Sequence, residues 1–299
     1  MKRLLAVFIL ICSAVPARAV FLGGVDQNFG KRDYVGTDVY GGLNLDSLSI
    51  TPEYRRWSDQ DSNGGFNTFQ ARVGYDMRWF GAGITGGTTL RHLQYSNVFG
   101  GADFAFTLSP LGDTNIRRIG GTGRGGAPVG KGLARVDFGG GILSTHHKQD
   151  ATTTAAGATL TQNDAHAFVG GSFLNVLLSG RFTKSFYDHD LKTLNATDLP
   201  TPQYEPIAGH LFYNAASYPS QSTLLSAEFT MLPMVAPFVS FTHTMYKQVG
   251  TVQPGDTRAY AAGVRVGLEM LAVQASYQRL SVTAGDDTNY TSIGASLRF

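Results

Sequence analysis

The sequence predicts an all-β protein: a transmembrane, antiparallel, up-and-down β-barrel of fourteen strands. Segments of about ten residues alternate apolar and polar side chains, which is typical of strands with one face on lipid and one on a lumen. Charged residues supply only 15% of the chain, whereas soluble domains carry about 25%. No apolar run reaches the length of about 18 residues that a membrane-spanning helix needs. A barrel accounts for all three observations.

The segment from Phe66 to Trp79 shows the alternation most clearly. Phe69, Val73 and Trp79 share one face of this strand, and Arg72 lies on the other. The apolar row begins and ends with aromatic residues. A strand tilted by about 40° rises roughly 25 Å over ten residues, which is the height of the apolar band between the aromatic girdles of membrane barrels.

Alternation divides the rest of the chain in the same way, although the first segment is weak. The expected strands are Val20–Gly30, Tyr34–Leu45, Ser47–Ser58, Phe66–Trp79, Gly81–Gln94, Asn97–Ser109, Lys131–Thr145, Asn163–Leu174, Asn175–Asp188, Ser222–Leu232, Met234–Lys247, Asp256–Glu269, Met270–Thr283 and Asp287–Phe299.

The connections between these segments alternate between short and long. Membrane barrels have short turns on one side and longer loops on the other, with both termini on the short side. Fourteen strands place every connection on its expected side, except that Pro110–Gly130 is long where a short turn is expected. A barrel of twelve strands, without Val20–Gly30 and Asn97–Ser109, is the alternative. That barrel puts short and long connections on the wrong sides.

The first nineteen residues have the pattern of a secretory signal peptide. Lys2 and Arg3 precede a short apolar run, and the segment ends in Ala17-Arg18-Ala19. We expect cleavage after Ala19, which divides the chain into a signal peptide (1–19) and a barrel (20–299). Cys12, the only cysteine, would be removed, and the formal charge would fall from +2 to −1. The mature chain then has no basic excess that would predict nucleic acid as a partner.

The last strand ends in the pattern Ser292-x-Gly294-x-x-Leu297-x-Phe299. This pattern resembles the C-terminal signal of bacterial outer-membrane β-barrels. The resemblance implies that the segment is the closing strand and that the barrel-assembly machinery reads it. It also implies a place in the bacterial outer membrane, with outer-membrane lipid and lipopolysaccharide as neighbours.

Charged residues of both signs fall on the polar rows of the expected strands. The parities predict an inward-facing, pore-lining set: Glu53, Arg55, Arg72, Asp76, Arg78, Arg91, Asp103, Arg135, Asp137, Arg181, Glu228, Arg265 and Glu269. One interpretation is a wet, charged pore wall that sets ion selectivity. The other is a salt-bridged interior that keeps the barrel shut. Fourteen strands and several inward glycines, which occupy no lumen, favour the open pore.

The whole pattern resembles small monomeric fourteen-stranded porins. The resemblance implies a channel for passive diffusion of ions and small hydrophilic solutes, with no catalytic activity, cofactor or metal. One alternative is a barrel hydrolase, for which Ser144 with His146, or Asp188 with His189, would be the candidates. The other alternative is a closed structural or adhesive barrel that acts through the long loop 189–221. This loop could be a lid over the pore or a surface that contacts other molecules.

Overall fold

We analysed a computed structural model of the chain. It describes residues 19–45, 47–60, 64–77, 79–109, 134–152, 156–173, 175–195, 199–200, 218–230, 234–268, 270–283 and 285–298. The strands are β1 (Ala19–Gly30), β2 (Val35–Leu45), β3 (Leu48–Ser58), β4 (Phe66–Asp76), β5 (Phe80–His92), β6 (Tyr95–Leu108), β7 (Ala134–Gln149), β8 (Ala158–Phe173), β9 (Val176–Tyr187), β10 (Pro219–Phe229), β11 (Val235–Tyr246), β12 (Thr257–Leu268), β13 (Leu271–Val282) and β14 (Thr288–Arg298).

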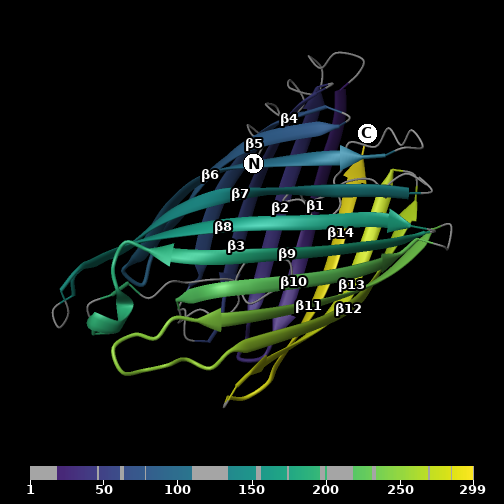
Figure 1. The fold of residues 1–299 in the computed structure, drawn as a ribbon. Helices are drawn as coiled ribbons and strands as arrows, with labels where there is room; N and C mark the ends of the chain where they lie inside the picture. Colours follow the sequence, from purple (N-terminus) through teal and green to yellow (C-terminus); the bar gives the residue numbers. More distant parts are fainter. Residues whose placement is uncertain are drawn as a thin grey trace, which may run out of the picture.

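The strands form one closed antiparallel barrel in which each pairs with its neighbours in sequence (Figure 1). β1 closes the barrel against β14, with Leu22 opposite Arg298 and Gly30 opposite Tyr290. The prediction of fourteen strands is confirmed. The twelve-stranded alternative is wrong, because β1 and β6 both have partners on each side.

The alternation in the sequence becomes a division between the outer and inner faces of this wall. In β4, Phe69 and Val73 are exposed on the outer face. Gly74, on the inward row of the same strand, is buried. The same parity holds across neighbouring strands, because each inward residue is paired with an inward residue of the next strand. A slip of one residue would turn every side chain to the opposite face. The register is therefore fixed by the apolar outer surface.

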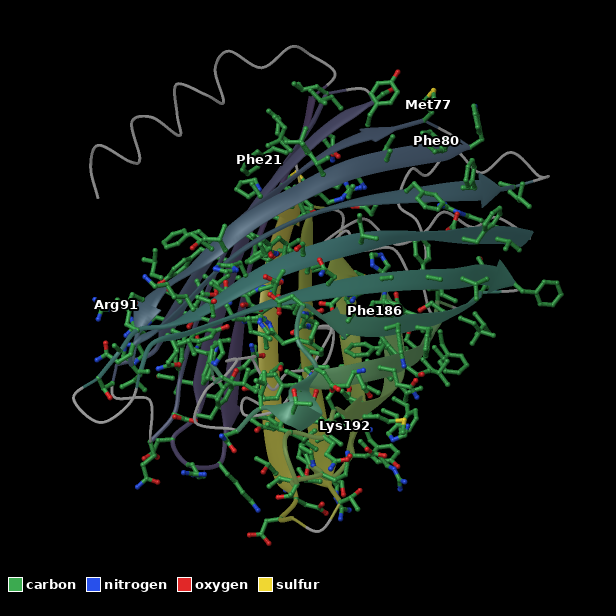
Figure 2. The ribbon with its side chains drawn as sticks, turned by 60° about the vertical axis from the view of Figure 1, so that its left-hand side comes forward. Phe21, Met77, Phe80, Arg91, Phe186 and Lys192 are labelled. Carbon is green, nitrogen blue, oxygen red and sulfur yellow. The ribbon has the colours of Figure 1, made fainter. Side chains whose placement is uncertain are left out.

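The two ends of the barrel differ. One end, here called the turn end, holds both the start of β1 and the end of β14, with short connections such as that between β8 and β9. The opposite end, here called the loop end, holds the long β9–β10 connection and its turn of 3-10 helix, η1 (Leu191–Thr193). Figure 2 shows Met77 and Phe80 at the turn end and Arg91 and Lys192 at the loop end. The long segment expected at 110–130 lies outside the described residues.

The hairpin of β7 and β8 is longer than predicted. β7 continues four residues beyond Thr145, to Gln149, and β8 starts at Ala158 rather than Asn163. Both extensions, 146–149 and 158–162, are mostly polar and have little apolar alternation, so the pattern did not predict them. No helix within the described ranges is long and apolar enough to cross a membrane.

Candidate functional site in the barrel interior

Most of the predicted pore-lining residues lie on inward rows. Most of them belong to the middle and turn-end levels of the wall: Glu53, Arg72, Asp76, Asp103, Arg181, Glu228 and Arg265. Arg55 lies nearer the loop end, one inward position below Trp57. Arg91 is near the rim of the loop end, where it forms an ion pair with Asp150 (2.7 Å). Arg78 and Glu269 lie outside the described residues.

The inward charges are paired along the wall. Arg72 donates two hydrogen bonds to the carboxylate of Asp103, at 2.9 and 2.6 Å. Such a bidentate ion pair is among the strongest interactions between arginine and a carboxylate. Arg265 donates to both carboxylate oxygens of Glu228, at 3.2 and 3.0 Å. Arg55 donates to Glu53 at 2.6 Å. The interior therefore combines both interpretations of the sequence, because its charges are salt-bridged yet face the lumen.

These pairs differ in how far they meet the lumen. The side chains of Arg72 and Arg265 keep 18% and 28% of their surface exposed. Arg135 and Asp137, which pair at the turn end of β7, keep only 1% and 0%. Arg72 and Arg265 thus remain available to a passing solute. Arg135 and Asp137 face inward but form a buried structural pair.

Inward glycines have a role that the sequence did not reveal. A Cβ atom at Gly24 would meet the ring of Tyr40, and one at Gly87 would meet the ring of Phe99. A Cβ atom at Gly83 would likewise meet the guanidinium of Arg72. Large inward side chains therefore lie flat over the glycines of neighbouring strands. The expectation that inward glycines simply leave lumen empty is wrong for Gly87, which the ring of Phe99 covers, whereas at Gly267 no described atom lies within 4 Å of the Cβ position.

The loop end of the interior is closed by rings. A cluster of buried residues, here called the mouth cluster, lines this level: Tyr34, Trp57, Phe66, Tyr95, Ala259, Leu280 and Tyr290. Their residual exposures are 1 to 7%. Phe66 stacks on Trp57 with ring centroids 4.7 Å apart, and Tyr34 meets Tyr290 edge-on at 5.2 Å. These rings therefore pack against one another and exclude water from their arc of the loop end.

A second buried group fills the mouth on the opposite arc. This loop cluster comprises Leu160, Leu191, Leu199, Tyr218 and Val249, with Tyr187 and Leu194 packed against it. Leu160 is an inward residue of β8, whereas Leu191 and Leu199 belong to the β9–β10 connection. The described parts of this connection therefore fold over the lumen. Of the two roles considered for the long loop, the lid agrees with this packing.

A chain of hydrogen bonds joins the two clusters. The Tyr95 hydroxyl lies 2.7 Å from Nδ1 of His147, and Nε2 of His147 lies 3.3 Å from Oε1 of Gln162. The Tyr187 hydroxyl donates to the same Gln162 oxygen at 3.4 Å. Gln162 in turn donates to Asp164 at 2.9 Å. Buried polar groups need such partners, and a satisfied network stiffens the structure around it.

Packing and hydrogen bonding at the loop end shift the pKa values of two groups, Tyr218 and Asp188. Burial raises the pKa of the Tyr218 phenol above its ordinary range. Partial burial also acts to raise the pKa of Asp188, but hydrogen bonds from His189 and from the backbone of Thr161 outweigh it. The net pKa of Asp188 is below its usual value. Asp188 therefore anchors the start of the loop as a carboxylate.

The mouth cluster escaped sequence reasoning. Its aromatic members occupy inward positions at the loop ends of their strands, where alternation predicts polar residues. An aromatic residue on the polar row at the same end of several strands was the available signal. It could not be interpreted without the register, because Tyr34 and Tyr290 are far apart in sequence.

The hydrolase candidates are not assembled into a catalytic arrangement. Ser144 and His146 lie on the outer face of β7, where Nδ1 of His146 is 3.4 Å from the Thr161 hydroxyl. His147 faces inward, so the adjacent histidines cannot share a metal ion. At the loop end, His189 contacts Asp188 at 2.8 Å. Among the described residues, no three His, Cys, Asp or Glu side chains are placed to hold a metal.

The assembly-signal residues occupy the closing seam. Ser292 donates a hydrogen bond to Asn28 of β1. Gly294 leaves room for Asp26, and Leu297 faces outward with 44% of its surface exposed. Phe299 lies outside the described residues. The pattern thus falls on the strand that completes the barrel, while its reading by an assembly machinery stays a prediction.

No protein-family profile and no curated protein matches the sequence. Solved structures do match the fold. CdiB from Acinetobacter baumannii has a TM-score of 0.52 at 8% identity, covering 95% of this chain and 60% of CdiB, so this chain spans less than two thirds of that protein. CymD, a monoaromatic hydrocarbon channel, has a TM-score of 0.52 at 10% identity over 94% of this chain and 88% of CymD. The NanC porin has a TM-score of 0.43 at 9% identity over 92% and 98%.

The closed antiparallel wall, apolar outside and polar inside, defines the class of protein. It is a β-barrel of the bacterial outer-membrane type. Porins and channels are prominent among the solved structures of this fold that it resembles. The low identities make this a likeness of fold, so the transported solute has to be argued from the interior itself.

Proposed function

We propose that this protein is a gated outer-membrane channel for passive diffusion of ions and small hydrophilic solutes. The observation that supports the proposal most is that the charged side chains and the buried aromatic rings lie at different heights in the barrel. Partly exposed ion pairs line the middle and turn-end levels of the lumen, and the buried mouth cluster lies at the loop end above them. A barrel that only served as a scaffold would have no need of a wet, charged middle. Conduction then requires the loop-end closure to open.

The charge pattern suits small polar solutes of either sign. Arg72 and Arg265 are each compensated by a carboxylate two strands away, so the lumen offers no strong single-sign field. Rings of one charge are what make a pore strongly selective. We therefore expect weak ion selectivity in the open state.

The β9–β10 connection is the element that would have to move. Its carbonyl at Leu191 accepts a hydrogen bond from the backbone N–H of Gly250 at 3.0 Å, which ties it to the β11–β12 connection. Leu191 and Val249 both belong to the buried loop cluster. A disulfide between these two positions would hold the lid closed.

The test is single-channel recording of the purified barrel in a planar bilayer. The wild type should give discrete conductance steps, and their absence would reject the channel. In the double variant Leu191→Cys, Val249→Cys, oxidation should abolish the steps and a reducing agent should restore them. The single variant Leu191→Cys is the control and should conduct under both conditions. Steps that persist in the oxidised double variant would reject this loop as the lid while leaving the channel in place.

A further inference from the structure

The outer face of β9 to β13 carries a row of cationic side chains near the loop end. Lys184 is on β9, His243 on β11, Arg258 on β12 and Arg279 on β13. Each lies on the outward row of its strand, because the residues directly before and after it are buried inward-facing ones. Counted from the turn end of the strand, Lys184, His243 and Arg279 are eight residues along and Arg258 is ten, so the four side chains lie near one level. We call this row the basic belt.

An aromatic row lies directly beneath the basic belt. Phe182, two positions from Lys184, and Tyr260, two positions from Arg258, are 45% and 50% exposed. Tyr277, two positions from Arg279, is 52% exposed. Outward aromatic residues at one level mark the boundary between hydrocarbon and headgroups. The basic belt therefore lies at headgroup depth.

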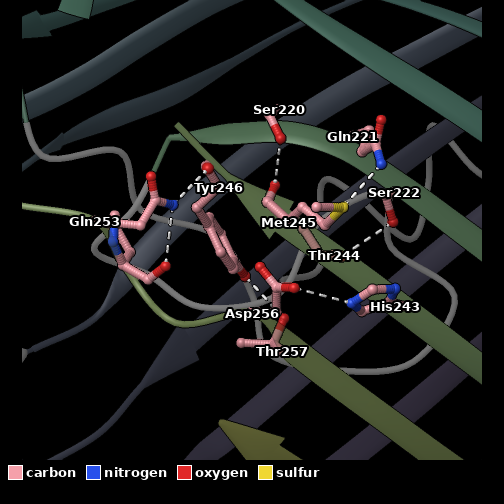
Figure 3. A network of polar contacts seen from close by, with 11 residues as sticks. Ser220, Gln221, Ser222, His243, Thr244, Met245, Tyr246, Gln253, Asp256 and Thr257 are labelled. Carbon is pink, nitrogen blue, oxygen red and sulfur yellow. Dashed lines mark hydrogen bonds and ion pairs between the residues drawn. The ribbon is translucent and has the colours of Figure 1, made fainter. Parts of the chain in front are cut away.

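Two members of the belt are held by carboxylates and two are not. His243 lies 3.3 Å from Asp256, as Figure 3 shows, and Arg279 donates to Asp287 at 2.9 Å. Within the described part of the chain, no hydrogen bond or ion pair engages the side chain of Lys184 or Arg258. Both acids belong to the loops above, which leaves the membrane side of the belt cationic.

At its own level the belt is confined to one side of the barrel; the outward His146 and Lys148 on β7 lie further toward the loop end. At the corresponding level of β5 and β6 the outward residues are Thr88, Leu90 and Val98, of which Leu90 and Val98 are 48% and 63% exposed. On β3, Arg56 is outward but solitary, and it donates to the carbonyl of Gly64. A general attraction to any anionic surface would not need such asymmetry.

We propose that the basic belt binds the phosphate groups of lipopolysaccharide. The loop end of this class of barrel faces the outside, so the belt lies in the outer leaflet. Arginine and lysine pair strongly with phosphate oxygens, and Arg can do so through two parallel hydrogen bonds. Lys184 and Arg258 are three strands apart, or about 14 Å. They therefore contact separate phosphates of one lipid A disaccharide or of neighbouring molecules.

The test measures retention of lipid A by the purified barrel in detergent, using native mass spectrometry. The double variant Lys184→Gln, Arg258→Gln should bind bisphosphorylated lipid A about tenfold more weakly than the wild type. The variant Arg56→Gln, which removes an outward arginine on β3, should bind as the wild type does. Dephosphorylated lipid A should bind weakly to all three proteins. Heat-modifiable migration on gels establishes that each variant is folded.

Three results would overturn the proposal. Equal binding of lipid A by the double variant and the wild type would remove the belt as the site. An equal loss in Arg56→Gln would show that any outward cation suffices. Phosphatidylglycerol that binds as tightly as lipid A, and is lost equally in the double variant, would show a general phosphate site rather than one for lipopolysaccharide.

Discussion

The loop-end and middle levels of the interior use similar side chains to opposite effect. At the loop end, Trp57 and Phe66 come from neighbouring strands, stack on each other and belong to the buried mouth cluster. In the middle, Tyr40 and Phe99 meet glycines of the neighbouring strand and lie against the wall. The comparison shows that the partner of an inward ring, rather than the ring itself, decides whether a barrel is filled or lined.

The largest expected effect is on assembly of the barrel, where β6 and β7 approach each other closely at the middle level. A Cβ atom at Gly101 would meet the backbone carbonyl of Ile142, which cannot swing away. We expect Gly101→Val to prevent assembly, whereas Gly267→Ala should assemble normally, because no other described atom lies near its Cβ position. Heat-modifiable migration measures both. Normal folding of Gly101→Val would show that the close approach of β6 and β7 is not required.

Removal of a ring from the mouth cluster should open the loop end and weaken the barrel. Phe66→Ala deletes a side chain that is 2% exposed, so we expect a loss of about 3–5 kcal/mol of stability and a higher channel open probability. Phe69→Ala on the same strand removes an outward ring that is 47% exposed. This control should leave channel opening unchanged. Equal recordings from the two variants would contradict the closure of the mouth by rings.

A substitution at the middle level should move the ring of Tyr40 from the barrel wall into the lumen. Gly24→Ala places a Cβ atom against the ring of Tyr40, which can rotate into the lumen because only side-chain atoms are in the way. We expect a folded protein that loses about 1–3 kcal/mol and has a smaller single-channel conductance. The double variant Gly24→Ala, Tyr40→Ala should regain conductance. Failure to regain it would place the constriction elsewhere.

The smallest expected effect concerns acid. The pKa of Asp188 is lowered in the folded protein, so its carboxylate stabilises the closed loop above the ordinary aspartate pKa of about 3.9. This contribution is lost as the pH falls through the lower folded value. We expect a modest rise in open probability below about pH 4, and Asp188→Ala should show that rise already at neutral pH. An open probability of Asp188→Ala that equals the wild type would contradict the anchor.

The strands of the barrel could be predicted from the sequence, but the contacts between inward side chains could not. Strand number and approximate strand positions followed from alternation, because residues such as Phe69 and Arg72 must go to opposite faces whatever their neighbours are. The inward position of Arg72 was predictable for the same reason. Its bond to Asp103 was not, because the register between strands β4, β5 and β6 decides which residues meet. The mouth cluster was missed for that reason as well.

The greater length of β7 and β8 has a consequence for how molecules reach the barrel. These two strands have sixteen residues each, whereas β2, β3 and β4 have eleven. At about 3.3 Å per residue, even three further residues extend a strand by roughly 10 Å. Among the described strands, β7 and β8 therefore extend the barrel wall further than β2 to β4 do. A solute that enters on the side of the shorter strands β2 to β4 would pass a lower wall than one that enters beside the β7–β8 hairpin.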